Sequence, residues 1–232
     1  MLSDSPSPKK IQVLLIYFSF SGQTGVLINR FATGLKEQGV EVFFEKLKPV
    51  KHLRFPVGGI FRTFAMMLTT FFRIRVPIQE LSSKCDQEYD LIILAGPTWS
   101  YNPSGPVLFF LDKYGKEVLE GREVLPLISC RGYWKMHWRG LRKKLQKCGA
   151  HFSNVIAFSH PNPEPWCTIG VFLKIAGKNP ERSGLISKHY DRFGHSNEQM
   201  EEAWRFGVKI GEALKCNTQL AEINFQTDLA LP

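Results

Sequence analysis

The sequence predicts a single α/β domain built on a doubly wound parallel sheet. Apolar runs of strand length alternate along the chain with segments in which apolar residues recur at helical spacing. The run at 89–96, YDLIILAG, is apolar almost without interruption, which is typical of a strand buried on both faces. This alternation favours parallel strands joined by right-handed crossovers, with helices on both faces of the sheet. At 232 residues, the chain is long enough for one domain with a substantial core.

Five strands and four helices are expected outside the two long segments 48–84 and 161–195, which are discussed below. The strands lie at residues 11–18, 40–47, 89–96, 123–129 and 152–159. A first helix spans about 26–39 and ends at a glycine, and a second begins after Ser104, which can cap it. A third, at 134–149, has an apolar stripe opposite a basic, solvated side. The last begins at Ser196, where Gln199 three residues later completes a capping-box pattern.

The ends of the chain and its cysteines restrict the class of protein. Residues 1–10 are polar and broken by prolines, so we expect a disordered tail without an export signal. The domain is expected over 11–216, followed by a C-terminal tail at 217–232. The five cysteines are scattered, with no CxxC pair, which favours free thiols in a reducing, cytoplasmic compartment. No metal site is predicted.

The composition is basic, with 30 Lys and Arg against 21 Asp and Glu, a formal charge of +9. A nucleic acid, an anionic ligand or a membrane surface are the partners that such a balance suggests. The cations are scattered over several segments, and no nucleic-acid-binding motif accompanies them. We therefore expect a generally basic surface and no nucleic-acid partner.

The segment SFSGQT, residues 19–24, joins the first strand to the first helix and carries no charge. In a parallel sheet, this position is where ligands bind. A helix N-terminus with several hydroxyl groups and a glycine can hold a phosphate without any lysine or arginine. The segment lacks the Gly-Lys-Ser/Thr ending of a P-loop and the glycine spacing of a Rossmann dinucleotide loop. Two hypotheses remain, an anion cup and a serine-rich turn that only caps the helix.

Three segments together resemble the flavodoxin-like superfamily. LIYFSFSGQT at 15–24 resembles its FMN-phosphate loop, and GPTWSYNPSG at 96–105 and SCRGYW at 129–134 follow the third and fourth strands, where this superfamily places loops against the isoalloxazine ring. The resemblance implies a flavodoxin-like sheet of order 2-1-3-4-5 with FMN as cofactor. The chain departs from the pattern at Ile28, where the superfamily signature usually has alanine, and in its charge, since electron-carrier flavodoxins are typically acidic.

The resemblance also assigns the binding residues, and no catalytic side chain, because the flavin carries the chemistry. The phosphate is assigned to Ser19, Ser21, Gly22, Gln23 and Thr24. The ring is assigned to Pro97, Thr98, Trp99, Ser100, Tyr101, Asn102, Cys130, Arg131, Gly132, Tyr133 and Trp134.

Several of these side chains have an ordinary structural alternative. Trp99 and Tyr101 either stack on the ring or pack in the core. Arg131 either stabilises negative charge on reduced flavin or forms a surface salt bridge. We expect Cys130 to be a structural thiol rather than a nucleophile, and His160 to lie in a solvent-exposed loop.

Two segments are too long for plain connections and are expected to be functional elaborations, residues 48–84 and 161–195. The apolar segment 55–75 allows three interpretations. It fills the core as a crossover helix, which we expect; it covers the flavin as a lid that admits an apolar substrate; or it contacts a membrane surface or a dimer partner through its flanking cations.

We expect an FMN-dependent oxidoreductase that passes electrons from NAD(P)H to a quinone or another apolar or aromatic acceptor, and that forms a homo-oligomer. The alternatives are a non-catalytic electron carrier for a protein partner and an FMN-free scaffold acting on acyl or aromatic compounds. The elaborations also resemble, more weakly, flavodoxin-like proteins associated with bacterial dialkylresorcinol-condensing enzymes, although no condensing nucleophile is evident.

Overall fold

The computed structural model describes residues 10–231. Of the tail expected at 1–10, residues 1–9 lie outside the described residues. No helix within the described part of the chain is both long enough and apolar enough to cross a membrane. All five cysteines are free, and four of them are buried.

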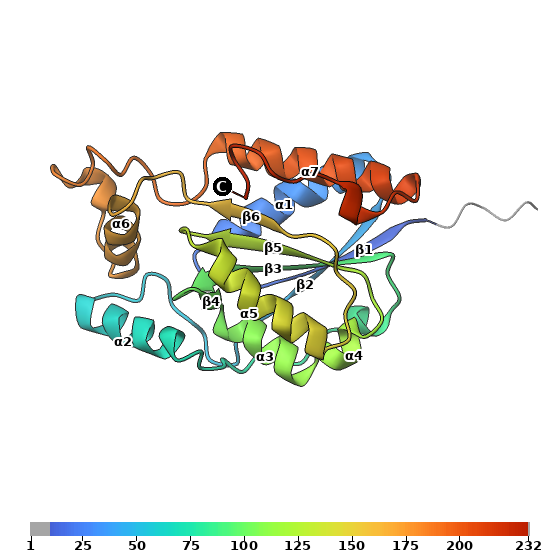
Figure 1. Ribbon diagram of the computed structural model, residues 1–232. Coiled ribbons are helices and arrows are strands. Elements are labelled where there is room, and N and C mark those ends of the chain that lie inside the picture. The colour runs from blue at the N-terminus through green and yellow to red at the C-terminus, as the bar shows by residue number, and fades with distance from the viewer. Residues whose placement is uncertain (1–9, 232) are drawn as a thin grey trace, which may run out of the picture.

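The five expected strands form one parallel sheet in the order β2-β1-β3-β5-β6 (Figure 1). Their bounds are β1 Gln12–Tyr17, β2 Glu41–Lys46, β3 Leu91–Trp99, β5 Val124–Cys130 and β6 Ile156–Ser159. This order, which reverses direction between β1 and β3, is the flavodoxin-like doubly wound topology, as predicted. A two-residue strand that was not predicted, β4 Asn102–Pro103, folds back antiparallel on the end of β3. The last strand is shorter than expected, because residues 152–155 precede it as irregular chain.

Helices cover both faces of the sheet. On one face lie α1 Gln23–Glu37 and α7 Asn197–Lys215, and on the other lie α3 Gly105–Lys113, α4 Gly115–Leu119 and α5 Trp134–Lys147. Two further helices, α2 Ile60–Phe71 and α6 Trp166–Ile175, lie beyond the carboxyl ends of the strands. Three single 3₁₀ turns complete the structure, at Ser83–Asp86, Pro180–Arg182 and Leu220–Glu222.

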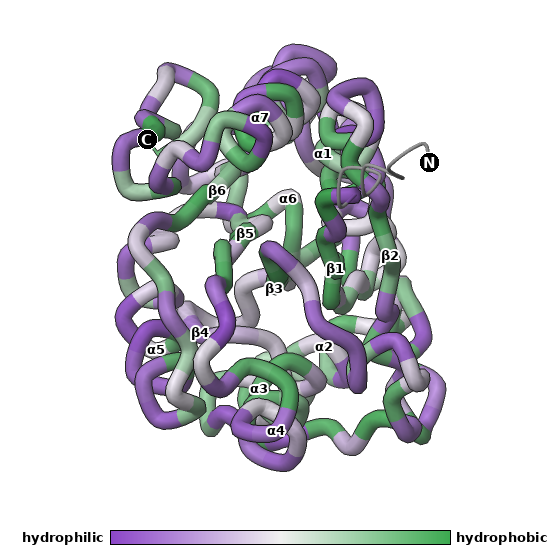
Figure 2. The backbone as a smooth tube through the Cα atoms, turned by 90° about the vertical axis from the view of Figure 1, so that its right-hand side faces the viewer, coloured by the Kyte–Doolittle hydropathy of each residue, from purple (hydrophilic) through white to green (hydrophobic). Residues whose placement is uncertain are grey.

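The sheet separates two apolar cores. In β1, Val13 and Leu15 face the core under α1 and α7, whereas Leu14 and Ile16 face the core under α3 and α5. The strands are therefore hydrophobic along their length, while α5 and α7 are largely hydrophilic outside (Figure 2). This pattern explains why the strand sequences read as continuous apolar runs.

Helices α1 and α7 pack at very close range. A Cβ atom built on Gly207 would lie 2.1 Å from the carbonyl oxygen of Phe31, and one on Gly34 would lie 2.2 Å from that of Trp204. Only glycine permits this approach, so Gly34 and Gly207 fix α7 over the first core. At the start of α7, the predicted capping box of Ser196 and Gln199 is also present.

The expected C-terminal tail, as far as it is described, lies along the domain. Phe225 and Ala230 are fully buried in the core under α1 and α7. The Leu231 N–H donates to the carbonyl oxygen of Ala157 in β6 (2.8 Å). The cap that the sequence predicts at the start of α3 is not formed. The Ser104 hydroxyl does not cap the helix and has no hydrogen-bond partner among the described residues.

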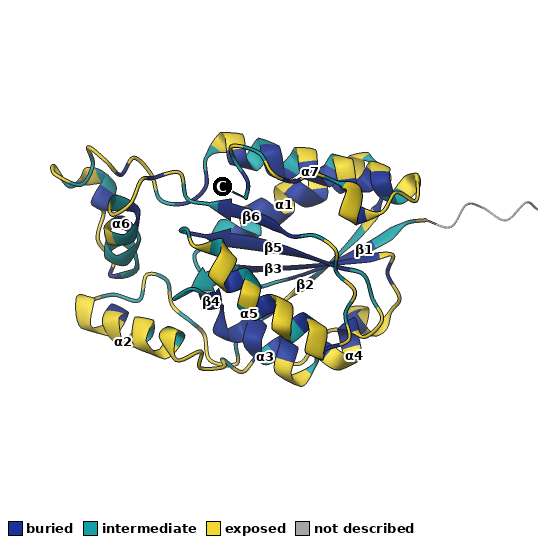
Figure 3. Ribbon diagram, in the orientation of Figure 1, coloured by how far each residue is buried: buried dark blue, intermediate teal, exposed yellow. Residues whose placement is uncertain are grey.

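The expectation that 55–75 fills the core is wrong. Helix α2 is exposed along nearly its whole length (Figure 3), and Thr63 is its one fully buried residue in the described structure. The sheet face that α2 would cover as a crossover is already occupied by α3, α4 and α5. The helix therefore lies beside the ends of the strands rather than against the sheet.

Candidate functional site

The loop after β1 forms a cup at the N-terminus of α1. Gly22 precedes the helix with φ +88°, in the left-handed region that favours glycine. Ser19 Oγ accepts a hydrogen bond from the Gly25 N–H (3.1 Å), and its own proton remains available for donation. The N–H groups of Gln23 and Thr24 have no acceptor among the described residues. The cup thus offers free backbone donors, hydroxyl groups and the positive end of the helix dipole.

Two side chains of the cup differ in their surroundings. Thr24 is 1% exposed and lines the cavity that the loop borders. The Gln23 carboxamide is tied to the loop before α7, because its Oε1 accepts from the His195 N–H (3.3 Å) and lies against Gly194. Gln23 therefore offers a ligand chiefly its backbone N–H, while its side chain fastens two loops together.

The second loop makes a tight hairpin between β3 and β4. Trp99 pairs with Asn102, and the two residues between them, Ser100 and Tyr101, have φ +44° and +67°. Two consecutive positive φ values are typical of a type I′ turn, and they are strained for residues other than glycine. Asn102 supports the turn by donating from Nδ2 to the Ser100 carbonyl oxygen (2.7 Å).

Within this loop, Pro97 and Thr98 lie at the end of β3 and line the narrow cavity described below. Thr98 Oγ1 is hydrogen-bonded to His137 Nδ1 (2.7 Å). The Trp99 indole makes edge contacts with Phe18 and Phe20, with ring centroids 5.5 and 5.6 Å apart. Trp99 is thus both packed against the core and part of the cavity wall.

The third loop, after β5, contributes Arg131 to the cavities. Its guanidinium lies 6.0 Å from the ring centre of Tyr101, and its Nε lies 3.6 Å from a carboxylate oxygen of Glu164. The side chain is 23% exposed and lines both cavities described below. Arg131 therefore forms an ion pair, as one expectation has it, while its part in stabilising reduced flavin stays a prediction.

The other members of the third loop have different surroundings. Gly132 lines the larger of the two cavities. Cys130 lines the narrow cavity, but its Sγ donates to the Phe158 carbonyl oxygen (3.4 Å), and burial raises the pKa of its thiol to about 11. Tyr133 packs edge-on against Tyr101. Trp134 is in neither cavity wall and packs against the small apolar cluster that includes Ile128 and Val155.

The three loops meet at one narrow cavity of about 90 Å³. Its wall includes Ser21 and Thr24 from the first loop, Thr98 from the second, and Ser129 and Arg131 from the third. The cavity lies at the carboxyl ends of β1, β3 and β5, at the point where strand order reverses, which is where doubly wound folds bind ligands.

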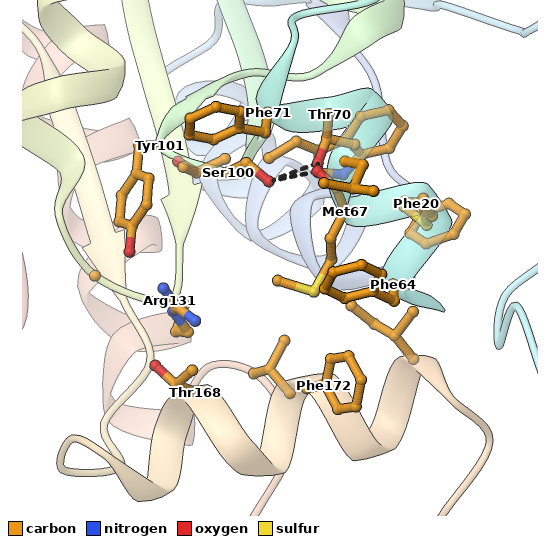
Figure 4. A pocket seen from close by; sticks show the side chains of 17 residues that line it. Phe20, Phe64, Met67, Thr70, Phe71, Ser100, Tyr101, Arg131, Thr168 and Phe172 are labelled. Atoms are coloured by element: carbon orange, nitrogen blue, oxygen red, sulfur yellow. Dashed lines mark hydrogen bonds between the residues drawn. The ribbon is translucent and has the colours of Figure 1, made fainter. Parts of the chain in front are cut away.

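A larger cavity of about 370 Å³ adjoins the first and shares part of its wall. It lies between α2 and α6, where Phe64 and Met67 face Phe172 across the space (Figure 4). Its polar groups are few: Arg131 lies near Tyr101 and Thr168 on one side, and Thr70 is hydrogen-bonded to Ser100 on another (Figure 4). An apolar chamber with a few convergent polar groups is typical of a site for a small molecule.

Helices α2 and α6 are joined to each other through their backbones. The N–H groups of Val57 and Gly58 both donate to the Ile175 carbonyl oxygen, at 2.9 and 3.4 Å. The Gly59 N–H donates to the Ala176 carbonyl oxygen at 3.0 Å. The two long elaborations, 48–84 and 161–195, therefore form one cap over the ends of the strands.

The expectation that His160 is solvent-exposed is wrong. Its ring lines the narrow cavity, 5.2 Å from the ring of His195, and its Nδ1 is buried without a hydrogen-bond partner among the described residues. Burial, with a smaller contribution from Arg131, lowers the pKa of His160 to about 4. His195 is bonded through Nε2 to Ser129 Oγ (2.8 Å), and burial lowers its pKa to about 3.

Sequence reasoning did not predict the aromatic wall of the narrow cavity. Phe55 stacks on Phe193 with centroids 5.7 Å apart and meets Phe20 edge-on at 5.3 Å. These residues come from three separate segments, and only the fold brings them together. The unusual length of both elaborations was the available signal.

Two other chemistries receive no support from the geometry. His137 is bonded to Thr98, while Cys130 is bonded to Phe158 and Ser159, so the two do not form a nucleophile–base pair. Among the described residues, no cluster of three His, Cys, Asp or Glu side chains is arranged to hold a metal ion.

No protein-family model matches the sequence, and no curated protein matches it. Among solved structures, the chain is similar to a flavoprotein in complex with FMN from Lactobacillus acidophilus, with 21% identity, TM-score 0.49, and coverage of 63% of this chain and 92% of that one. It is also similar to a flavodoxin from the domain Archaea, with 14% identity, TM-score 0.49, and coverage of 88% and 99%. A third is a putative flavoprotein from Bacteroides eggerthii, with 16% identity, TM-score 0.49, and coverage of 72% and 98%. The fold assignment rests on the strand order described above.

Proposed function

We propose that this protein binds FMN at the carboxyl ends of β1, β3 and β5 and passes electrons from NAD(P)H to an apolar aromatic acceptor such as a quinone. The observation that carries the proposal is the convergence of three loops, separate in sequence, on one cavity at the switch point of the sheet. The similarity to a flavoprotein in complex with FMN and to a flavodoxin agrees with the proposed cofactor.

The residues present fit a phosphate at the cup. Four hydrogen-bond donors lie within residues 19–24. They are the free N–H groups of Gln23 and Thr24 and the hydroxyl groups of Ser19 and Ser21. Gly22 leaves open space, because nothing lies within 4 Å of where its Cβ would be. Such a cup satisfies an anion with neutral donors and the helix dipole.

The residues present also fit a planar, partly polar ring beside the cup. Thr98, Trp99 and Gly132 offer apolar faces and backbone groups. His160 lines the narrow cavity, and its low pKa keeps its ring neutral near pH 7. The Arg131 cation is positioned to stabilise negative charge that develops on a bound group.

When bound, FMN supplies the redox chemistry, accepting a hydride and releasing electrons to the acceptor. The chain holds the cofactor and excludes water. The larger cavity supplies the second site, since its apolar side chains from α2 and α6 suit an aromatic acceptor and its cation suits the polar edge of one.

A small acceptor is favoured over a protein partner. A non-catalytic carrier exchanges electrons through an exposed cofactor edge, whereas here the cap formed by α2 and α6 stands over the cavity. The FMN-free scaffold remains the alternative if no flavin is bound.

The test is extraction and chromatographic identification of the cofactor from the purified protein, followed by reconstitution with FMN. We expect FMN at about one equivalent per chain, and NAD(P)H consumption with a water-soluble quinone and no added protein. A colourless protein that does not take up FMN would refute the cofactor. Bound FMN with no turnover until a protein partner is added would refute the enzyme and favour the carrier.

A further inference from the structure

Helix α2 has its polar side facing the protein and its apolar side facing outward. Thr63 is fully buried and donates from Oγ1 to the Gly59 carbonyl oxygen (2.9 Å). Thr70 is hydrogen-bonded through Oγ1 to Ser100 Oγ (2.6 Å) at the β3–β4 turn. Phe61, by contrast, is 91% exposed and Phe72 is 70% exposed. This is the reverse of the usual arrangement for a surface helix of a globular protein.

The exposed apolar residues form one continuous surface. Phe61, Leu68 and Phe72 are separated by seven and four positions, which places them on the same side of the helix. Ile60, Phe64 and Phe71 lie beside them, and each is more than half exposed. We call these six residues the outer face of α2. All six side chains are at least 45% exposed, and exposed apolar surfaces of this kind mark interaction sites.

The segment that carries α2 holds most of the protein's surplus positive charge. Residues 46–79 contain seven Lys or Arg and no Asp or Glu, out of a net charge of +9 for the whole chain. Arg75 is paired with Asp112. The other six have no ion-pair partner among the described residues. Two of them, Arg62 and Arg73, lie on or directly after α2, beside the outer face.

We propose that α2 docks the protein on the surface of an anionic lipid bilayer. The outer face inserts at the boundary between headgroups and acyl chains, and the arginines and lysines of the segment contact the headgroup phosphates. Large apolar side chains with flanking cations, on a helix too short to span, are the features of an interfacial helix.

Charge complementarity favours lipid over a second copy of the chain. In a two-fold pair the outer face would meet itself, and the basic segments of both copies would come together. No acidic residue within 46–79 is available to compensate that repulsion. An anionic bilayer provides the compensating charge over the whole segment.

The docking would place the larger cavity at the lipid surface. Phe64, Leu68 and Phe71 belong to both the outer face and the cavity wall. An apolar acceptor dissolved in the bilayer could then reach the cavity without crossing water, a consequence that rests on the proposed function. The docking itself does not, because it involves no residue of the cup.

Vesicle flotation tests the apolar part of the proposal, with phosphatidylcholine vesicles compared with phosphatidylcholine–phosphatidylglycerol vesicles. We expect binding to the mixed vesicles, and a loss of about tenfold or more in affinity for the double variant Phe61→Ser and Phe72→Ser. Both side chains are exposed, so circular dichroism should confirm an unchanged fold. The control is Val26→Ser with Met136→Ser, whose side chains are 50% and 54% exposed on α1 and α5 and whose removal should change nothing.

A pair of charge variants tests complementarity at constant net charge. Arg62→Glu with Arg73→Glu should abolish most binding to the mixed vesicles, whereas Arg139→Glu with Arg142→Glu, on the exposed basic side of α5, should retain it. The proposal is overturned by equal binding to neutral vesicles, by equal losses in the two charge variants, or by no flotation. A dimer that dissociates in the Phe61 and Phe72 variant, without lipid binding, would assign the face to a second copy instead. None of these outcomes depends on whether FMN is present.

Discussion

The two halves of the candidate site are built in opposite ways. The cup and its neighbouring loops are direct continuations of buried strands, and their polar groups are held by short hydrogen bonds such as those of Thr98 to His137 and Ser129 to His195. The cap of α2 and α6 is made from two long elaborations, is mainly apolar, and leaves α2 exposed. The first half is positioned by the core, and the second is attached at its edge.

This difference indicates which part of the structure suits each part of the proposed function. Strand ends are fixed by the packing of the sheet, so they suit a cofactor that must be held in one orientation. Elaborations that cover only the rim can change without affecting the core, so they suit the choice of acceptor and of surface. Substitutions in the two halves should therefore have separable effects.

The largest effect is expected in the sheet and the helices that cover its faces, which we call the body of the protein, because α1 and α7 are closely packed there. Gly207→Val would drive a side chain into the backbone of α1 at Phe31, and it should reduce the free energy of unfolding by about 3 kcal/mol or more. Denaturant unfolding followed by circular dichroism measures the change. Gly184→Ala, with nothing within 4 Å of the new atom, should be nearly neutral. If Gly207→Val were equally well tolerated, the body would not be the rigid half.

The next effect concerns cofactor retention alone. Thr24→Leu removes a hydroxyl from the cup and adds bulk at a site that is 1% exposed, so FMN affinity should fall by roughly tenfold to a hundredfold. Titration of the flavin-free protein with FMN gives the dissociation constants. Thr33→Leu, on an exposed turn of the same helix, is the control. Equal affinities in both variants would remove the phosphate from the cup.

A pH dependence of stability is expected at His160, which lines the narrow cavity. Burial lowers the pKa of His160 from 6.5 to about 4. The unfolded chain therefore binds a proton that the folded chain does not, and the stability contributed by neutral His160 is complete above pH 6.5 and lost as the pH falls toward 4.

The free energy of unfolding should be measured across that pH range. Its slope against pH should be smaller in His160→Gln than in the unchanged protein, by up to about 1.4 kcal/mol per pH unit. The matched change at exposed His151, His151→Gln, should leave the slope as it is. An unchanged slope in His160→Gln would mean that the ring is not neutral and buried in solution.

The smallest effect is expected in the cap. Phe64→Ala with Phe172→Ala opens the larger cavity on both sides, and it should raise KM for a water-soluble quinone by about tenfold without changing FMN affinity. Phe61→Ala, which lies on α2 outside the cavity wall, should have no effect in buffer without lipid. A parallel loss of FMN in the first variant would show that the two halves are not separable.

The sequence predicts the body of the fold well. Continuous apolar runs identify buried strands such as β3, and Ser196 with Gln199 fixes the start of α7, because both signals are local. The loops after β1, β3 and β5 could also be assigned as one site, since parallel strands bring their carboxyl ends together.

The cap could not be predicted to the same degree. The apolar stripe of α2 indicates a helix with two different sides, but periodicity does not say which side faces the protein. Helix α6 lies in a segment rich in proline and glycine, which reads as irregular chain. The burial of His160 and its contact with His195 depend on two distant loops, and no local pattern reports such a contact.

The backbone hydrogen bonds that join Val57–Gly59 to the end of α6 have a consequence for ancestry. Each elaboration supplies the partners for main-chain groups of the other, and deleting either would leave those groups unpaired. The two insertions should accordingly have been acquired together, and related chains should carry both or neither. Evolution can exchange this paired module on an unchanged sheet, so a change of acceptor or of location in the cell would require no new fold.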